Sequence, residues 1–280
     1  MDTLDALILG VVQGLAEYLP ISSSGHLEIC SKILGMDMSG AESLQFDLIL
    51  HIATVLSTIV VLWKRFVPLC NAFFCLRTST PEFSYVMKLF LSAIPVAIVG
   101  FCFKDFIEGF FGAELTTVGI CLCVTAALLA FAYFFRTSPL MAARRNSSRL
   151  PYQPREIGWV DAFVIGCAQA VAVLPGLSRS GTTIATGIII GDKREKVATF
   201  SFFMVIIPIL GEALLDCLKI MKGDEAVSQT IGVLPLIVGF FSSFIVGCLA
   251  CKWMLNLVAK GKLVLFAVYC LIVGILCICW

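Results

Sequence analysis

Apolar residues occur along this chain in long runs separated by short polar segments. Runs of roughly 20 apolar residues predict helices that span a membrane. Six such runs are present, at 45–63, 85–103, 113–135, 197–218, 229–251 and 263–280. The composition agrees, since 59% of residues are hydrophobic and 14% are charged, against about 25% charged residues in soluble domains. The sequence therefore predicts an all-α polytopic membrane protein.

Two further apolar regions, residues 4–36 and 158–191, depart from this pattern because Pro, Ser and Gly interrupt each of them at its centre. Each half is shorter than the stretch of about 20 residues that crosses a bilayer. Irregular backbone at membrane depth is tolerated only where protein or a water-filled cavity surrounds it. We therefore expect two re-entrant helix pairs, each of which enters and leaves the membrane on one side.

Basic residues concentrate in alternate loops once these two regions are treated as re-entrant. The loops rich in Lys and Arg are 64–84, 136–157, 192–196 and 252–262. The remaining loops and both termini carry few basic residues. By the positive-inside rule the basic set is cytoplasmic, so both termini are expected outside and the re-entrant pairs enter from opposite faces.

The two interrupted regions also resemble each other. Leu9–His26 can be aligned with Ile165–Thr183, so that Gln13 matches Gln169 and each segment continues through a Pro into a serine-rich turn. Similar segments in opposite orientation form an inverted repeat, which places a site at the repeat interface. The predicted parts of this single membrane domain, 1–280, are repeat 1 at about 1–135, repeat 2 at about 155–280 and a cytoplasmic linker at 136–157.

Two charged residues in these breaks are candidates for chemistry. Glu17 lies four residues after Gln13, on the same helix face, and an ionisable group inside a membrane is a functional hypothesis by default. Arg179 lies between Ser178 and Ser180, where a planar donor beside a helix N-terminus suits a phosphate. The structural alternatives are a carboxylate at the membrane edge and an Arg that snorkels or pairs with Glu17 to brace the fold.

Three consecutive serines, Ser22, Ser23 and Ser24, stand where a helix is expected to restart. At least one of them is expected to cap that helix. His26 lies about one turn from Ser23, within range of a hydrogen bond that activates or orients a hydroxyl nucleophile.

The tips of the two re-entrant pairs can meet, since they approach from opposite sides. Glu17, Ser23, His26 and Arg179 are then expected to form one polar pocket inside an apolar shell. Asp47 and His51, four residues apart near the same site, are interpreted as a bracing pair rather than as catalytic residues.

The two breaks resemble the motifs of a known family. QGLAEYLPISSSGH resembles the Glu/Gln-x-x-x-Glu motif and adjoining Ser-Gly-His of bacterial undecaprenyl-diphosphate phosphatases, the bacitracin-resistance family. PGLSRSGTT is similar to that family's Pro-Gly-x-Ser-Arg-Ser-x-x-Thr signature at every fixed position, and the likeness extends to PREIGWVDAFVIGCAQ and FDLILHIATVL. Gln13 occupies the first motif position, where many members carry Glu, and this places more of the chemistry on Glu17.

The resemblance implies hydrolysis of undecaprenyl diphosphate at the outer face of the bacterial cytoplasmic (inner) membrane, which recycles the lipid carrier for cell-wall synthesis. It implies a divalent cation, Mg²⁺ or Ca²⁺, held by Glu17. Ser23 would attack the phosphorus, His26 would assist proton transfer and Arg179 would neutralise charge, although His26 or a water activated by Glu17 could be the nucleophile. The expected substrate-binding residues are Gln13, Ser22, Ser24, Ser178, Ser180, Gly181 and Thr183.

A transporter or flippase of a lipid phosphate or anion is the competing class, because inverted repeats and broken helices are also typical of secondary transporters. The expected partners are the membrane and a polyprenyl diphosphate lipid. The net charge of +1 offers no footprint for nucleic acid, and the oligomeric state, a homodimer included, stays open.

Overall fold

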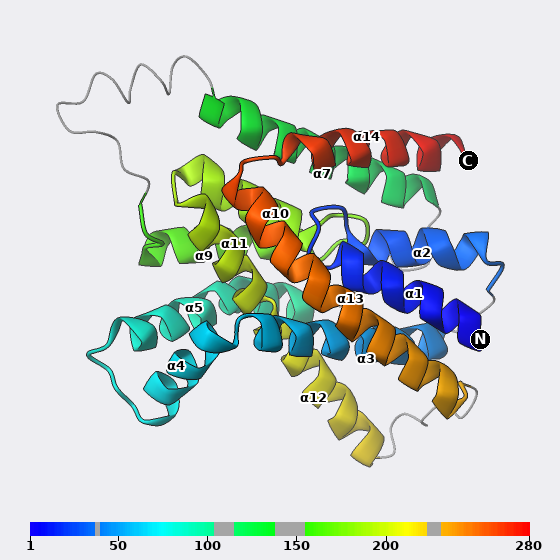
Figure 1. Cartoon of the computed structure of the whole chain (residues 1–280), viewed down its shortest axis with the longest axis horizontal. Coiled ribbons are helices and arrows are strands. Elements are labelled where there is room, and N and C mark those ends of the chain that lie inside the picture. The colour runs from blue at the N-terminus through cyan, green and yellow to red at the C-terminus, as the bar shows by residue number, and fades with distance from the viewer. Residues whose placement is uncertain (37–39, 104–114, 138–154, 223–230) are drawn as a thin grey trace.

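In the computed structural model, the described residues form α-helices and no β-strand (Figure 1). The described residues are 1–36, 40–103, 115–137, 155–222 and 231–280, so most of the predicted linker 136–157 lies outside them. The helices are α1 (Thr3–Ala16), α2 (Ser23–Ile33), α3 (Gly40–Val61), α4 (Trp63–Phe74), α5 (Pro81–Cys102), α7 (Leu115–Thr137), α9 (Trp159–Val171), α10 (Arg179–Ile190), α11 (Arg194–Met204), α12 (Ile206–Lys222), α13 (Val233–Ala259) and α14 (Val264–Cys279).

Each predicted spanning segment coincides with one of these helices or, for 197–218, with the consecutive α11 and α12. Among the described residues, four helices are long and apolar enough to cross a membrane, or five if α3 and α4 together form one bent span. The helix α14 has 16 residues, fewer than the roughly 20 of a typical span. An all-helical, multi-pass membrane protein is thus confirmed, and the count of six spans stays a prediction.

The segment predicted as the loop 64–84 contains a helix, α4, which is a correction to the sequence-based expectation. The chain bends by 94° between α3 and α4. Lys64 and Arg65 are exposed beside the exposed Trp63, and Phe74 is exposed at the far end. A short helix with cationic and aromatic side chains is typical of a segment that lies in the membrane interface.

The two interrupted regions begin their helices in the same way. In α1 and α9, Asp5 and Asp161 each accept a hydrogen bond from the backbone N–H of the N-cap residue, at 3.1 and 2.9 Å. In α2 and α10, the N-caps Ser22 and Ser178 each accept from the backbone N–H of the Gly three residues later, at 3.3 and 3.1 Å. Such caps satisfy backbone donors that the helix leaves free. The two regions, which are similar in sequence, therefore also have similar local structure where their helices begin.

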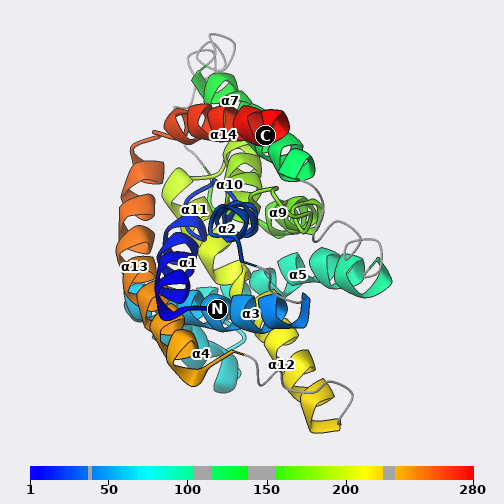
Figure 2. The same cartoon turned by 90° about the vertical axis from the view of Figure 1, so that its right-hand side faces the viewer.

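The helix α1 packs along α13 and α9 packs along α5 (Figures 1 and 2). Gly10 and Gly166, which match in the aligned regions, lie where the two helices of each pair approach most closely. A Cβ at Gly10 would overlap Ser242 Oγ, and a Cβ at Gly166 would lie 2.7 Å from Ser92 Cα. Small residues let helices approach this closely inside a membrane.

We expect Gly166→Ala to lower the free energy of unfolding by about 1–3 kcal/mol, because the added methyl group overpacks the α5–α9 contact. Gly100→Ala in α5 is the matched control, since a Cβ there meets no atom within 4 Å. It is expected to be neutral or stabilising by up to about 1 kcal/mol, as Ala is favoured over Gly inside a helix. Thermal unfolding in detergent would compare the two, and equal midpoints would contradict the packing argument.

The helices α2 and α10 lie in the middle of the bundle, between the α1–α13 pair and the α5–α9 pair (Figure 2). The two termini lie at one end of the bundle, and α4 and the α13–α14 turn lie toward the other (Figure 1). Basic segments gather at this second end, where a Cβ at Gly261 would overlap the guanidinium of Arg194 and Lys193 Nζ is 2.8 Å from Glu156 Oε1. The sorting of loops by charge therefore agrees with their positions in space.

Candidate functional site

The breaks between α1 and α2 and between α9 and α10 lie against each other. A Cβ at Gly25 would lie 3.2 Å from Gly176 Cα, and a Cβ at Gly181 would lie 3.2 Å from Pro20 Cβ. Ser180 Oγ, at the start of α10, donates a hydrogen bond to the carbonyl of Leu19 at 3.2 Å. The expectation that the two tips meet is confirmed.

Glu17, the residue that follows α1, is the centre of the polar contacts at this junction. Its Oε2 accepts hydrogen bonds from Ser23 Oγ at 2.8 Å and from Gln13 Nε2 at 3.1 Å. Its Oε1 lies 3.7 Å from Arg179 Nη2. The Glu17 side chain is 8% exposed and that of Arg179 is 28% exposed. A carboxylate buried to this degree needs such partners to offset the loss of its hydration.

His51 of α3 is the histidine in this cluster. Its Nδ1 donates to the carbonyl of Asp47 at 2.7 Å, which leaves Nε2 as an acceptor in the neutral ring. Arg179 Nη2 donates to this Nε2 at 3.2 Å, and Glu17 Oε2 is 3.7 Å away. The sequence predicts His51 near the site in a bracing pair with Asp47, whereas in the structure His51 contacts Arg179 directly.

A sequence signal for His51 was available. Asp47, His51, Thr54 and Thr58 recur at helical spacing along the mostly apolar run 46–61, and that spacing puts them on one face. A polar stripe of this kind indicates a helix face turned toward the protein interior rather than toward lipid.

His26 makes different contacts from those predicted. Its Nδ1 donates to the carbonyl of Ser22 at 2.8 Å, and its Nε2 lies 2.8 Å from the hydroxyl of Tyr269 on α14, with the two rings stacked. Ser23 donates to Glu17 instead. The predicted contact between His26 and Ser23 is therefore corrected: both ring nitrogens of His26 are engaged elsewhere, because α2 turns the ring toward α14.

Each of the two breaks contains a residue with a positive φ, Ser22 in the first and Gly176 in the second. Ser22 has a φ of 70°, unusual for a residue other than Gly, and strained residues of this kind cluster at functional sites. Gly176 has a φ of 88° and lies against α7, where a Cβ would be 2.9 Å from Val118 Cα. Only Gly combines this φ with so close an approach.

The other predicted substrate-binding residues have identifiable positions. Ser22 and Ser178 are the N-caps of α2 and α10. Ser24 Oγ is 3.4 Å from Ser22 Oγ, and Gly181 supplies the capped N–H of α10. Thr183 Oγ1 lies 2.6 Å from Ser201 Oγ of α11. Of these residues, Ser180 and Thr183 line a cavity at the junction.

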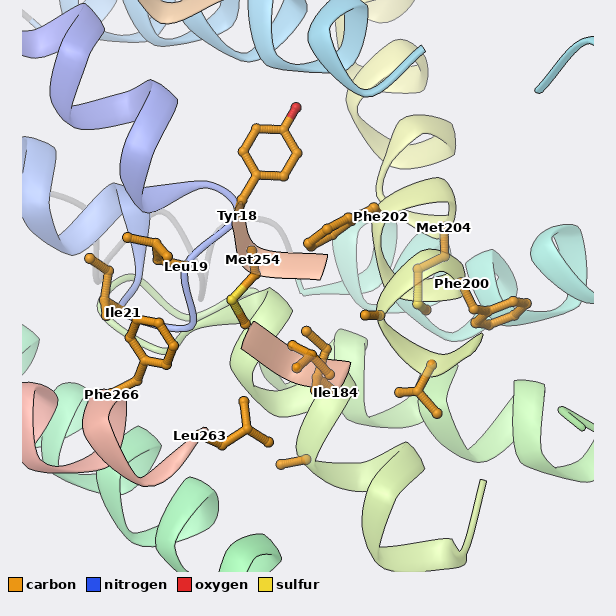
Figure 3. Close-up of a cluster of buried hydrophobic side chains, with 14 of the residues drawn as sticks. Tyr18, Leu19, Ile21, Ile184, Phe200, Phe202, Met204, Met254, Leu263 and Phe266 are labelled. Carbon is orange, nitrogen blue, oxygen red and sulfur yellow. The ribbon is translucent and has the colours of Figure 1, made fainter. Parts of the chain in front are cut away.

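This cavity is small, with a volume of about 20 Å³, and Glu17 and Arg179 also line it. A cavity of this size holds about one water molecule. An apolar cluster borders it, in which Phe202 meets the Tyr18 ring edge-on at 5.2 Å (Figure 3). The hydroxyl of Tyr18 points away from this cluster and donates to the carbonyl of Thr54 at 2.6 Å.

The donor set can accommodate a hard divalent cation only in part. Within the described residues there is no group of three or more His, Cys, Asp or Glu side chains that could hold a metal. Next to Glu17, however, the buried Gln13 Oε1 has no hydrogen-bond partner. A carboxylate and an amide oxygen are ligands that Mg²⁺ and Ca²⁺ accept, and Mg²⁺ often completes its shell with substrate phosphates. The residues present fit a cation shared with a phosphate ligand.

These features define the class of protein: a multi-pass membrane protein with a polar carboxylate, guanidinium and hydroxyl site inside its helix bundle. The family model described as Bacitracin resistance protein BacA matches residues 6–276. The chain belongs to this family.

The similarity to known relatives extends over almost the whole length of this chain and of each relative. A protein named undecaprenyl-diphosphatase from Bacteroides thetaiotaomicron is 51% identical over 275 residues, which are 98% of this chain and 97% of the relative. Proteins of the same name from Parabacteroides distasonis and Christiangramia forsetii are 50% and 40% identical, over 99% and 98% of this chain and 98% and 97% of their own lengths.

Proposed function

We propose that this protein hydrolyses undecaprenyl diphosphate to undecaprenyl phosphate and inorganic phosphate, and so returns the lipid carrier to cell-wall synthesis in a bacterial cytoplasmic membrane. The observation that carries the proposal is the buried contact of Glu17 with Ser23 and Arg179, in a chain about half identical to undecaprenyl-diphosphatases. A diphosphate needs positive charge and a positioned nucleophile, because phosphoryl transfer depends mainly on positioning and charge stabilisation.

In the proposed reaction, Ser23 Oγ attacks the terminal phosphorus and its proton passes to Glu17 Oε2, its hydrogen-bond acceptor at 2.8 Å. The bond from this phosphorus to the bridging oxygen breaks, and undecaprenyl phosphate leaves. Water then hydrolyses the phosphoserine and releases inorganic phosphate. Arg179 stabilises the charge on the phosphoryl oxygens. His26 is held by the Ser22 carbonyl and the Tyr269 hydroxyl, and no proton transfer is assigned to it in this scheme.

Ser23→Ala is expected to lower the rate of phosphate release by at least about 10²-fold, since covalent catalysis is lost. Ser24→Ala is the matched control in the same turn, because Ser24 has no contact with Glu17 among the hydrogen bonds of the described residues; it is expected to affect KM more than kcat. Full turnover by Ser23→Ala would replace the serine nucleophile by a water activated by Glu17.

A divalent cation, Mg²⁺ or Ca²⁺, would be held by Glu17 and Gln13 Oε1 and would neutralise charge on the diphosphate. We expect EDTA to abolish phosphate release from a polyprenyl diphosphate in detergent, and excess Mg²⁺ or Ca²⁺ to restore it. Undiminished release after thorough chelation would remove the cation from the proposal and leave Arg179 to neutralise the charge. Folded protein that releases no phosphate with either cation would instead favour transport of the lipid phosphate.

We further propose the finer architecture of six spans and two re-entrant pairs related as an inverted repeat. The matching caps, Ser22 with Ser178 and Asp5 with Asp161, support it. So does the packing of α1 on α13 and of α9 on α5 through matching glycines. The positive-inside rule then orients the site toward the outer face. The two repeats would lie in opposite orientations in the membrane and share one site at their interface.

A further inference from the structure

Gln169 of α9 is a buried amide whose nitrogen has no hydrogen-bond partner among the residues that the structure describes. The residue is 1% exposed. Leaving such a donor unpaired destabilises a fold, so each case in a native protein calls for an explanation. Gln169 lines the cavity at the junction together with Glu17, Arg179 and Ser180.

The matching residue in α1 shows what this amide lacks. Gln13 is the counterpart of Gln169 in the aligned regions, and its Nε2 donates to Glu17, four residues later, at 3.1 Å. The residue four positions after Gln169 is Val173, which has no acceptor. The first break therefore supplies a carboxylate to its glutamine, and the second break does not.

A single phosphate oxygen that enters the cavity, which has room for about one water-sized group, would supply the missing acceptor. The guanidinium of Arg179 lines the same cavity, and a hydrogen bond from an amide to a charged oxygen is stronger than one between neutral groups. A carboxylate at position 173 would repel a phosphate there. The second break has Val173 where the first break has Glu17. The amide of Gln169 therefore has no carboxylate beside it in its own break and can donate to an anionic ligand.

We propose that Gln169 is a substrate-binding residue, whose Nε2 donates to a phosphate oxygen of the polyprenyl diphosphate beside Arg179. This inference rests on the proposed function for the identity of the ligand. It assigns the second repeat an amide donor in addition to its guanidinium.

Gln169→Met tests the assignment, because Met has a similar length and no donor. We expect KM for a polyprenyl diphosphate to rise about tenfold or more, while the midpoint of thermal unfolding stays equal or rises, since an unpaired donor has been removed. Inorganic pyrophosphate is expected to raise the unfolding midpoint of the wild type, as any ligand of the folded state does, and to raise that of Gln169→Met less.

Tyr85→Phe is the matched control. Within the described part of the chain, the buried hydroxyl of Tyr85 also has no hydrogen-bond partner. Its ring, however, packs against Phe200 and Phe203 and does not line the cavity. Tyr85→Phe is expected to leave KM and the response to pyrophosphate unchanged.

An unchanged KM and an unchanged pyrophosphate response in Gln169→Met would overturn the inference, as would a lowered unfolding midpoint with an unchanged KM, which indicates a purely structural role. Wild type that releases no phosphate would refute the proposed function alone, because the pyrophosphate response still decides the role of Gln169. Wild type that fails to respond to pyrophosphate and releases no phosphate would overturn both.

Discussion

Glu17→Gln is expected to lower kcat for phosphate release by about 10²- to 10⁴-fold, the range that a positioned general base contributes. The amide has nearly the same shape as the carboxylate and can still accept a hydrogen bond from Ser23. It cannot take the proton of Ser23, and it removes the negative charge that lies 3.7 Å from Arg179. Measurement of kcat and KM in detergent with saturating polyprenyl diphosphate would determine the loss.

The matched control for this variant is Glu28→Gln. Glu28 lies on α2 and its nearest cation is Lys32, at 3.6 Å, with both side chains more than a third exposed. An exposed pair of this kind contributes only about 0–1 kcal/mol to stability. Because Glu28 does not line the cavity at the junction, kcat is expected to match that of wild type. A kcat within tenfold of wild type for Glu17→Gln would contradict the role of Glu17 as the proton acceptor.

Arg179→Lys is expected to reduce kcat/KM by about 10²- to 10³-fold, the loss typical when a donor to developing negative charge is removed. Lysine keeps the positive charge, but all its donors are on one nitrogen, so it cannot reproduce the planar, bidentate geometry with which a guanidinium binds a phosphate. Unfolding measured in parallel would separate this effect from a loss of folded protein.

Arg155→Lys is the matched control at a basic site outside the junction. Arg155 Nη2 donates to Asp161 Oδ1 at 3.0 Å and to the carbonyl of Ile190 at 3.0 Å, on the side of α9 where the helix begins. The kinetics of this variant are expected to match those of wild type. Equal losses from both substitutions would mean that Arg179 acts through general stability rather than through the substrate.

Local features of the chain were sufficient to predict several parts of the structure. The apolar runs predicted the helices, because helix formation and burial in a membrane both depend on the local run of side chains. The serines before each restart predicted the caps, and Ser22 and Ser178 occupy those positions. The helix α4 was not predicted, because its 12 residues are too few for a span and Pro68 interrupts them.

The position of Glu17 next to Arg179 was also predictable, because two buried opposite charges in facing breaks have few other partners. What the sequence by itself determined is therefore the membrane class, the two breaks and the charged residues within them. All of these depend on periodicity, composition and short-range capping.

Only the tertiary structure decided which side chains meet across the junction. His26 and His51 are both polar residues near the breaks, but His26 of α2 contacts Tyr269 of α14, whereas His51 of α3 contacts Arg179. The free amide of Gln169 was likewise invisible in the sequence, because an unpaired donor is defined by what surrounds it. Contacts between distant segments depend on helix rotation and separation, which differences of a few ångströms decide and local sequence does not encode.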